Sequence, residues 1–260
     1  MADDHPLTVF FGGQPGAGKT MGQRRIEAMH PGEHLVKIIG DDLRQFHPDY
    51  TRLVEEAPLD MPSETAYASG MWIGMGVAEA NARGYSIVIE GTWRNPATVL
   101  DEARKAKQLG RRTHAVALAV QPSASLISVL ERYYKDRLAG RPSRWTPLDA
   151  HDRTIMALPG TVAQVAADPA IDRLTVMNRY GEVLFDGVNR ATRMDEGVRA
   201  WNEAFTKPIS LRERRTMARQ LELVERGHAM DDEANAEVDD AIWATRQSLS
   251  PADRLLSLVR

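Results

Sequence analysis

The first 188 residues show two alternating hydrophobic patterns. One consists of short, nearly continuous apolar runs, which are typical of strands buried on both faces of a sheet. The other consists of longer stretches in which apolar residues recur at helical spacing. The apolar runs lie at residues 7–11, 35–39, 85–89, 113–120, 174–177 and 183–185, and the helical stretches lie at about 19–30, 64–82, 96–110, 123–139 and 151–167.

Strands that alternate with helices predict a mostly parallel sheet with helices on both faces, which is an α/β fold. The last two apolar runs flank Asn178-Arg179-Tyr180-Gly181, and this turn sequence predicts a hairpin. After Gly187 the apolar runs end and only helical patterns follow. We therefore predict an α/β domain at residues 1–188 and an α-helical C-terminal extension at residues 189–260.

Two helical faces and an acidic run characterise this extension. Residues 231–240 contain six acidic residues and no basic one. The extension is expected to pack on the sheet or to mediate self-association, or else to bind a partner. The first apolar face comprises Leu211, Ala218, Leu221 and Val224, and the second comprises Val238, Ala241, Ile242 and Thr245.

The composition is that of a soluble globular protein, with 43% hydrophobic and 27% charged residues. The net charge of −3 argues against nucleic-acid binding, which usually requires a basic excess. No apolar run is long enough to span a membrane, and the acidic N-terminus does not resemble a secretory signal. We therefore expect a cytoplasmic protein with no membrane contact. The absence of cysteine excludes disulfides, thiolate metal sites and cysteine nucleophiles.

A phosphate-binding P-loop follows the first predicted strand and precedes the first long helix. Its pattern, G-x-x-x-x-G-K-[ST], lets backbone N–H groups surround phosphates at the positive end of a helix. Lys19 is expected to contact the β- and γ-phosphates, and the Thr20 hydroxyl to bind Mg²⁺. The nucleotide-binding residues are Gly13, Gln14, Pro15, Gly16, Ala17, Gly18, Lys19 and Thr20.

A P-loop is compatible with ATP or GTP and with several protein classes. The Asn-Lys-x-Asp sequence by which GTPases read guanine is absent, and this disfavours a GTPase. Asp41 and Asp42 follow the second predicted strand, at the sheet edge where α/β proteins bind ligands. Asp41 is the candidate base that accepts the proton of an attacking hydroxyl, and Asp42 the candidate cap of the next helix.

The third predicted strand ends in Glu90-Gly91-Thr92-Trp93-Arg94. Apolar residues closed by an acid place Glu90 near magnesium or substrate hydroxyls, and Thr92 and Arg94 are donors for a polar substrate. Further along, Arg132 lies on a predicted helix, and Arg137, Arg141 and Arg144 lie in or beside residues 138–149, which are expected to form a mobile lid. Arginines on a closing lid can stabilise a phosphoryl group during its transfer.

Beyond the P-loop, further segments within residues 7–186 follow one another in a set order: Asp41–Tyr50, Val88–Arg94, Glu131–Tyr133, Arg144–Pro147, Ala150–Asp152, Leu158–Pro159 and Asn178–Gly181. With these segments the sequence resembles the zeta toxins, the kinase components of epsilon–zeta toxin–antitoxin systems. The most specific signals are Asp-x-Leu-Arg with His47-Pro48, and Glu-Gly-Thr-x-Arg from Glu90 to Arg94.

The resemblance implies a P-loop kinase-like fold and an enzyme that transfers the γ-phosphate of ATP, with Mg²⁺, to the 3′-hydroxyl of the amino sugar in UDP-N-acetylglucosamine. It implies that Asp41 is the catalytic base and that Lys19, Arg132 and Arg144 hold and stabilise the phosphates. Glu90, Thr92 and Arg94 match substrate-side residues. Zeta toxins are usually neutralised by a small helical antitoxin that covers the ATP site.

Two features depart from the family pattern. Residues 70–76 read Gly-Met-Trp-Ile-Gly-Met-Gly, without the acid expected on the helix after the Asp41 segment. The acceptor therefore stays open between a UDP-sugar and another acceptor such as an antibiotic, a nucleoside or NAD. The extension at 189–260 also lies outside the resemblance, and its acidic run could inhibit the kinase from within by occupying the substrate cleft. A non-catalytic, nucleotide-gated interaction module is the third reading.

Overall fold

The computed structural model describes residues 5–188, 191–231 and 235–249, and within them a six-stranded sheet forms the centre of the molecule. The strand order is β2-β3-β1-β4-β5-β6, with β1 to β5 parallel and β6 antiparallel to β5. Each of the six predicted strands is present, but β2, at the edge of the sheet, is partly exposed and not buried on both faces. The strands are β1 (Leu7–Gly12), β2 (Val36–Ile39), β3 (Ile87–Gly91), β4 (Arg112–Leu118), β5 (Arg173–Met177) and β6 (Val183–Val188).

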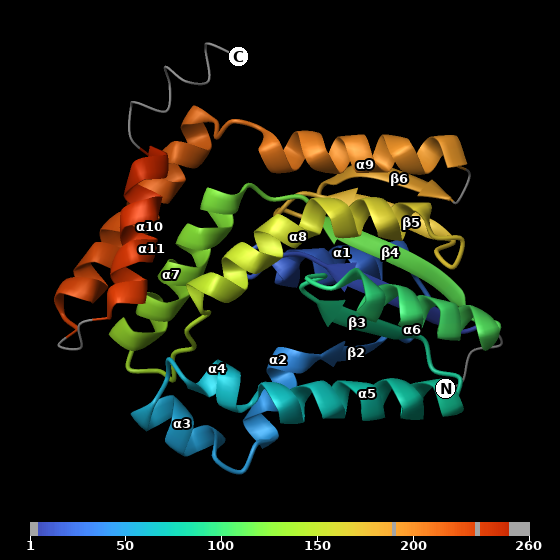
Figure 1. Cartoon of the computed structure of the whole chain (residues 1–260), viewed down its shortest axis with the longest axis horizontal. Helices are drawn as coiled ribbons and strands as arrows, with labels where there is room; N and C mark the ends of the chain where they lie inside the picture. Colours follow the sequence, from blue (N-terminus) through green and yellow to red (C-terminus); the bar gives the residue numbers. More distant parts are fainter. Residues whose placement is uncertain (1–4, 189–190, 232–234, 250–260) are drawn as a thin grey trace.

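Helices cover both faces of this sheet, which confirms the predicted α/β class (Figure 1). The long helices of the first 188 residues all appear where the hydrophobic pattern predicts them. The helices are α1 (Lys19–Met29), α2 (Gly40–Leu43), η1 (Arg44–Phe46), α3 (Tyr50–Glu56), α4 (Met61–Glu64), α5 (Ala66–Ala82), α6 (Pro96–Gln108), α7 (Pro122–Leu138), α8 (Leu148–Ala167), α9 (Ala191–Thr206), α10 (Leu211–Ala229) and α11 (Ala236–Leu249).

Strand β1 shows that helices pack against both faces of the sheet. Successive side chains of a strand point to opposite faces. Val9 and Phe11 are therefore buried with residues of α1 and α7, whereas Phe10 is buried with residues of α6, α8 and α9. This continuous burial on both faces explains why β1 reads as an unbroken apolar run.

Residues 40–64 contain the short elements α2, η1, α3 and α4, which the hydrophobic pattern does not predict. Elements of three to seven residues are too short to show a helical period. Leu53, Val54 and Met61 form a small core of their own beneath this segment. The segment connects β2 to α5, and Arg44 holds it through contacts with Asp41, Pro62 and Thr65.

The described part of the C-terminal extension is helical, as predicted. Helix α9 packs against α8, β5 and β6, and its Trp201 donates an indole hydrogen bond to the carbonyl of Leu118 at the end of β4, at 2.9 Å. Helices α10 and α11 pack on α7 instead. Residues 232–234, part of the acidic run, lie outside the described residues.

The second apolar face of the extension is confirmed, because Val238, Ala241, Ile242 and Thr245 are all buried. The first face is partly wrong. Leu211 and Ala218 are exposed, and α10 instead buries Met217, Val224 and Gly227. Gly227 belongs to this face because a Cβ there would lie 2.7 Å from the ring of Tyr134 on α7. A glycine that permits close approach carries no hydrophobic signal, so periodicity alone misplaces the face.

No helix among the described residues is long and apolar enough to cross a membrane.

A matched pair of glycine substitutions tests this packing. Gly227→Ala should lower the free energy of unfolding by about 1 kcal/mol or more, because overpacking against the buried Tyr134 ring costs about 1–3 kcal/mol and outweighs the better helix propensity of alanine. Gly70→Ala on α5, where a Cβ would meet nothing within 4 Å, should raise it by about 0.5–1 kcal/mol. Urea unfolding measures both, and equal effects of the two substitutions would contradict the close α7–α10 contact.

Candidate active site

The P-loop joins β1 to α1 in a conformation that requires glycine. Gly16 and Gly18 have positive φ values of 76° and 86°. A Cβ at Gly16 would lie 2.1 Å from the carbonyl oxygen of Ser125, and one at Gly18 would lie 2.9 Å from that of Arg179. Helix α1 begins at Lys19, so its free N–H groups face the loop. The geometry is that of a cradle for an anion.

Buried polar contacts hold this loop against α7. The amide of Gln14, which is fully buried, donates to the carbonyl of Val120 at 2.6 Å and lies 3.4 Å from the hydroxyl of Ser125. Ser125 in turn lies 2.9 Å from Nε2 of His151, whose Nδ1 is 3.1 Å from Asp152. This series resembles a hydrolytic triad, but Ser125 is fully buried and also contacts the carbonyl of Pro122. We interpret it as a support for the P-loop, one that the sequence analysis missed.

Lys19 and Glu90 meet beside the loop. The register pairs Phe11 with Glu90 and thereby places the carboxylate next to the start of the P-loop. Lys19 Nζ donates to the carbonyls of Gly13 and Gln14 at 3.1 and 3.3 Å and lies 4.0 Å from Glu90 Oε1. Gln23 donates to the other oxygen of Glu90 at 2.5 Å.

Burial dominates the electrostatics of this pair. It lowers the pKa of Lys19, against the opposing effects of Glu90 and Asp41. It raises the pKa of Glu90, although Lys19 and the hydrogen bond from Gln23 act in the other direction. Both groups are thus destabilised as ions by desolvation, and a bound ligand with compensating charge would relieve this cost for the lysine.

Asp41 lies at the start of α2, directly after β2, where two arginines hold it. Arg144 NH2 is 2.8 Å from Asp41 Oδ2, and Arg44 Nε is 3.3 Å from Oδ1. Burial by itself would raise the pKa of Asp41, but Arg144, Arg44, Lys19 and Arg132 together lower it below its ordinary value. The carboxylate is therefore ionised at neutral pH.

Arg44 also anchors the segment that follows Asp41. Its NH1 donates to the carbonyl of Pro62 at 2.6 Å and to the hydroxyl of Thr65 at 2.5 Å. The expectation that Asp42 caps a helix is wrong: Ile39 is the N-cap of α2, with no side-chain cap hydrogen bond, and Asp42 lies exposed within the first turn. The helix starts at Gly40 because β2 runs directly into it, which leaves no cap position for Asp42.

Arg132 and Arg144 approach the site from α7 and from the lid, which we define as residues 139–147 between α7 and α8. Arg132 NH2 donates to the hydroxyl of Thr146 at 2.8 Å, while its buried Nε has no partner among the described residues. Burial, together with nearby Arg144, lowers the pKa of Arg132 to about 10, so the side chain stays protonated at neutral pH. An unpartnered buried donor beside a second guanidinium indicates a position built for an anion.

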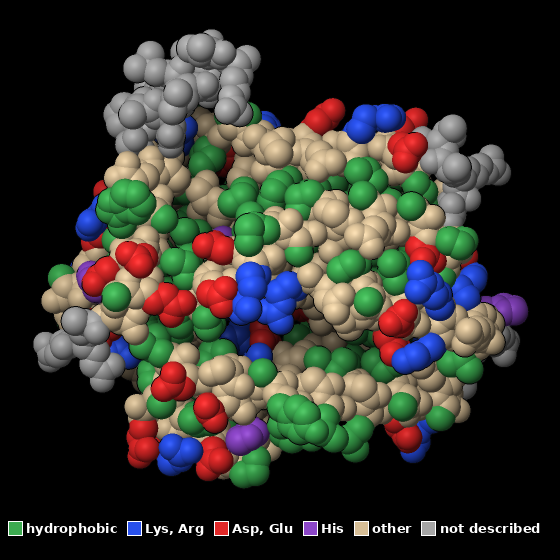
Figure 2. Space-filling view, in the orientation of Figure 1, with side chains coloured by type: hydrophobic (Ala, Val, Ile, Leu, Met, Phe, Trp, Pro, Cys, Tyr) green, Lys and Arg blue, Asp and Glu red, His purple; other side chains and the backbone are tan. Residues whose placement is uncertain are grey.

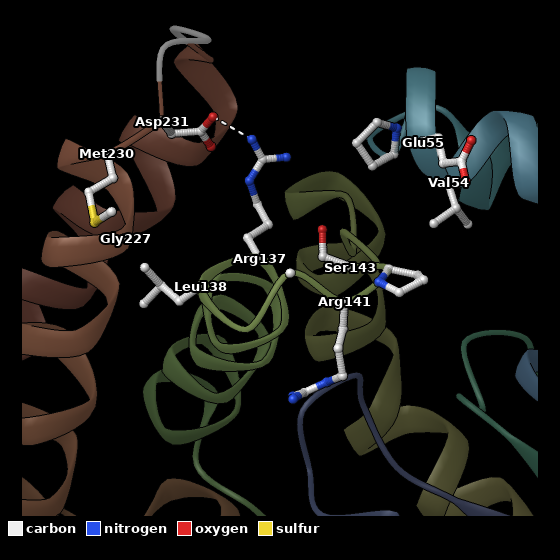
Figure 3. A pocket seen from close by; sticks show the side chains of 12 residues that line it. Val54, Glu55, Arg137, Leu138, Arg141, Ser143, Gly227, Met230 and Asp231 are labelled. Carbon is white, nitrogen blue, oxygen red and sulfur yellow. Dashed lines mark hydrogen bonds and ion pairs between the residues drawn. The ribbon is translucent and has the colours of Figure 1, made fainter.

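Two other arginines of this region do not join the site. Arg137 pairs with Asp231 at 2.6 Å and Arg141 pairs with Asp136 at 2.6 Å, and both line a cavity between α3, the lid and the end of α10 (Figure 3). Figure 2 shows the molecule hollowed near the middle of one face, between α5 and α8, with acidic and basic side chains in the hollow.

The remaining predicted site residues make no contacts of this kind. Within the described chain, neither Thr92, Arg94 nor Thr20 forms a hydrogen bond or ion pair through its side chain. Trp93, between Thr92 and Arg94, has a positive φ of 56° and is buried against Gly12, where a Cβ would lie 2.0 Å from the Trp93 ring. The structure thus brings together Lys19, Asp41, Glu90, Arg132 and Arg144, and leaves Thr92 and Arg94 beside them at the strand end.

The described residues contain no group of three or more His, Cys, Asp or Glu side chains that could hold a metal ion. Proteins usually bind Mg²⁺ together with nucleotide phosphates through only one or two protein ligands. Thr20, exposed at the start of α1, would supply a hydroxyl ligand there.

Comparison with known proteins decides the family. The family model described as Zeta toxin matches residues 1–190. The chain belongs to the zeta toxin family. This membership confirms the resemblance seen in the sequence, and the matched residues include the P-loop, the Asp41 segment and the Glu90 segment.

Curated zeta toxins are 27–29% identical to this chain over the aligned stretch. Toxin PezT of Streptococcus pneumoniae serotype 4 is 27% identical over 188 residues, which cover 72% of this chain and 74% of that protein. Toxin zeta of Enterococcus hirae is 29% identical over 190 residues, which cover 72% of this chain and 65% of that protein. The matched stretch is thus just under two thirds of the Enterococcus toxin.

Solved structures show the same fold. A chain of the PezAT toxin–antitoxin system of S. pneumoniae superposes with a TM-score of 0.74 at 24% identity and covers 87% of this chain and 89% of that chain. The AvrRxo1-ORF1:AvrRxo1-ORF2 complex, in a structure with ATP, superposes with a TM-score of 0.54 at 14% identity and covers 93% of this chain and 80% of that chain. Both matches extend beyond residue 190, so this fold also accommodates C-terminal helices like those of the extension.

The ion pair between Asp41 and Arg144 makes a direct prediction for pH titration. Arg144→Gln should raise the pKa of Asp41, because the arginine is the strongest group that lowers it. Since the folded pKa is depressed, this pair stabilises the fold above the pKa of the unfolded state, and the stabilisation is lost as pH falls through the folded value. Carbon-13 NMR of the aspartate carboxyl groups measures the pKa of Asp41, and comparison with Asp41→Asn assigns its signal.

Arg141→Gln is the matched control, because Arg141 pairs with Asp136 and not with Asp41. An Asp41 pKa that does not change in Arg144→Gln would show that the ion pair is not formed in solution.

Proposed function

We propose that this protein is an ATP-dependent kinase that phosphorylates a hydroxyl of a UDP-sugar, UDP-N-acetylglucosamine at its 3′-hydroxyl, and acts as the toxin of a toxin–antitoxin system. The observation that carries the proposal is the 2.8 Å contact between Asp41 and Arg144, close to the P-loop lysine. It joins a candidate base and a candidate phosphate-binding arginine. Family membership supports the same activity.

The P-loop side of the site would hold the donor. The loop N–H groups and Lys19 bind the β- and γ-phosphates of ATP, and Arg132 and Arg144 neutralise charge that develops on the transferred group. The Thr20 hydroxyl would help to hold Mg²⁺, which would supply positive charge next to the phosphates of ATP. The match to the AvrRxo1 structure with ATP supports a nucleotide in this fold.

Asp41 would act on the acceptor. It accepts a hydrogen bond from the sugar hydroxyl and takes its proton as the new O–P bond forms and the bond between the γ-phosphorus and the ADP oxygen breaks. Because the pKa of Asp41 is lowered, the carboxylate is ready to accept this proton at neutral pH. Glu90, Thr92 and Arg94 surround the same strand end and would contact the sugar nucleotide.

The partner proposed for this toxin is a protein antitoxin. The S. pneumoniae match belongs to a toxin–antitoxin system, and AvrRxo1-ORF1 is seen in complex with ORF2. Inhibition by the chain's own extension finds less support. In its acidic run, Asp231 pairs with Arg137 and Glu237 accepts hydrogen bonds from Trp145 and Leu148. No described acidic residue of the extension pairs with Lys19, Arg132 or Arg144.

Acceptor identity is tested by incubating the purified protein with ATP and each candidate acceptor, and by locating the new phosphate with phosphorus NMR. We expect ADP release that depends on UDP-N-acetylglucosamine and a phosphate on the 3′-oxygen of the sugar. Turnover on a nucleoside, an antibiotic or NAD, with none on UDP-sugars, would refute the proposed acceptor but would still support kinase activity.

Asp41→Asn separates a kinase from a non-catalytic nucleotide-binding module. Loss of the general base should lower kcat by about 10²–10⁴-fold, while ATP affinity measured by calorimetry stays within a few-fold. Asp42→Asn is the control, because Asp42 is exposed and unpaired with the site arginines in the described structure. Wild-type behaviour of Asp41→Asn in cells and in the assay would favour the module.

Arg144→Ala should lower kcat by about 10³-fold or more, as expected for an arginine that stabilises the transferring phosphoryl group. Its effect on ATP binding should be much smaller. Arg141→Ala, which removes a lid arginine paired with Asp136, should leave both quantities unchanged. Equal losses in ATP affinity and in kcat/KM for Arg144→Ala would mean that the residue only binds ground-state nucleotide.

A further inference from the structure

The second half of the lid is held by three different elements. Arg144 contacts Asp41 on α2, at 2.8 Å, and Thr146 accepts a hydrogen bond from Arg132 on α7, also at 2.8 Å. Trp145, between them, donates its indole N–H to Glu237 on α11, at 3.0 Å. Contacts to the proposed active site thus alternate along the chain with a contact to the C-terminal extension.

Glu237 holds this segment at two points. One carboxylate oxygen accepts from Trp145, and the other accepts from the backbone N–H of Leu148 at 2.5 Å. Leu148 is the first residue of α8, so the carboxylate lies at a helix N-terminus, where negative charge is favoured. Asn235 accepts hydrogen bonds from the N–H groups of Glu237 and Val238, which fixes the start of α11.

The surroundings make this contact rigid. Trp145 is 1% exposed and lies edge-on to Tyr133, with ring centroids 5.4 Å apart. It belongs to the same core cluster as Val238, Ala241 and Ile242 of α11. A displacement of Glu237 would therefore move a buried indole whose neighbour in sequence is Arg144.

The first half of the lid is packed differently. Residues 140–143 border a cavity of about 500 Å³, together with residues of α3 and of the C-terminal ends of α7 and α10 (Figure 3). Gly140 has a positive φ of 62°, and a Cβ there would meet nothing within 4 Å. This half has room to move, so the position of Arg144 depends on the contacts of the second half.

We propose that Glu237 is a positioning residue, which places Arg144 for phosphoryl transfer by holding Trp145 and Leu148. This inference rests on the kinase function proposed above. It implies that α10 and α11 help to position the active site, although both helices lie outside the residues matched by the family model. Glu237, one acid of the acidic run, thereby supports the lid.

Glu237→Ala in the full-length chain tests the inference. A misplacement of a catalytic group by about 1 Å can cost about 10²-fold in rate, so kcat should fall by about that factor while the KM for ATP stays within about three-fold. Amide hydrogen exchange of residues 143–150 should increase, and the pKa of Asp41 should rise, as is also predicted for Arg144→Gln. Glu225→Ala is the control, because Glu225 pairs with Arg246 in the same helical layer, at 2.7 Å, away from the lid.

A purely structural role predicts a different result. Glu237→Ala would then lower thermal stability, with kcat per folded molecule, lid exchange and the Asp41 pKa all unchanged, and this outcome would overturn the inference. Exchange and the Asp41 titration need no acceptor. Failure of the wild-type protein to phosphorylate any UDP-sugar would refute the proposed function, whereas unchanged exchange and Asp41 pKa would refute the role of Glu237.

Two milder variants keep the test decisive if Glu237→Ala does not fold. Trp145→Phe keeps the buried ring and removes the indole donor, and Glu237→Gln keeps one acceptor oxygen and removes the charge. Both should lower kcat less than Glu237→Ala and leave ATP binding intact. In the double variant of Glu237→Gln and Trp145→Phe the losses should be less than multiplicative, because both act through one contact; fully multiplicative losses would contradict the proposal.

Discussion

The ion pair between Asp41 and Arg144 connects two parts of the molecule that the sheet alone does not bring together. Asp41 is fixed by β2 and α2, whereas Arg144 belongs to the lid after α7. Without this pair the parallel strands would still deliver Lys19 and Glu90 to one edge, because their positions follow from the β1–β3 register. In the proposed kinase, a site for two substrates would depend on the contact of the lid with Asp41.

The charges at this edge are balanced for an anionic ligand. Lys19, Arg132 and Arg144 contribute three positive charges near the two carboxylates of Asp41 and Glu90. Burial lowers the pKa of both Lys19 and Arg132, which means that their charged forms are held at a cost in the protein alone. A phosphate group would offset that cost and would satisfy the buried Nε of Arg132. The same desolvation would strengthen their interaction with charge that develops during transfer.

Much of this arrangement could be predicted from the sequence. Asp41 lies two residues after the end of β2 and Glu90 is the next-to-last residue of β3, so both acids are found by looking at the ends of the predicted strands. The features that sequence reasoning misses depend on tertiary contact. Asp42 is a residue type that often caps helices, but it lies inside the first turn of α2 and not at its N-cap. Gly227 lies on the buried face of α10 because the absence of a Cβ lets the ring of Tyr134 pack against it. Ser125 and His151 support the P-loop although they lie 26 positions apart.

Glu237 shows the same limit from the functional side. In the sequence it is one acid in an acidic run, and composition alone makes such a run look like an inhibitory or solvated segment. Its role as a hydrogen-bond acceptor for Trp145 requires α11 to pack on α7 and α8, and that packing is carried by Val238, Ala241, Ile242 and Thr245. Trp201 on α9 makes a comparable contact with the end of β4. Each of these helices therefore reaches back to a strand end or loop at the ligand edge, so the extension acts on the site through ordinary packing.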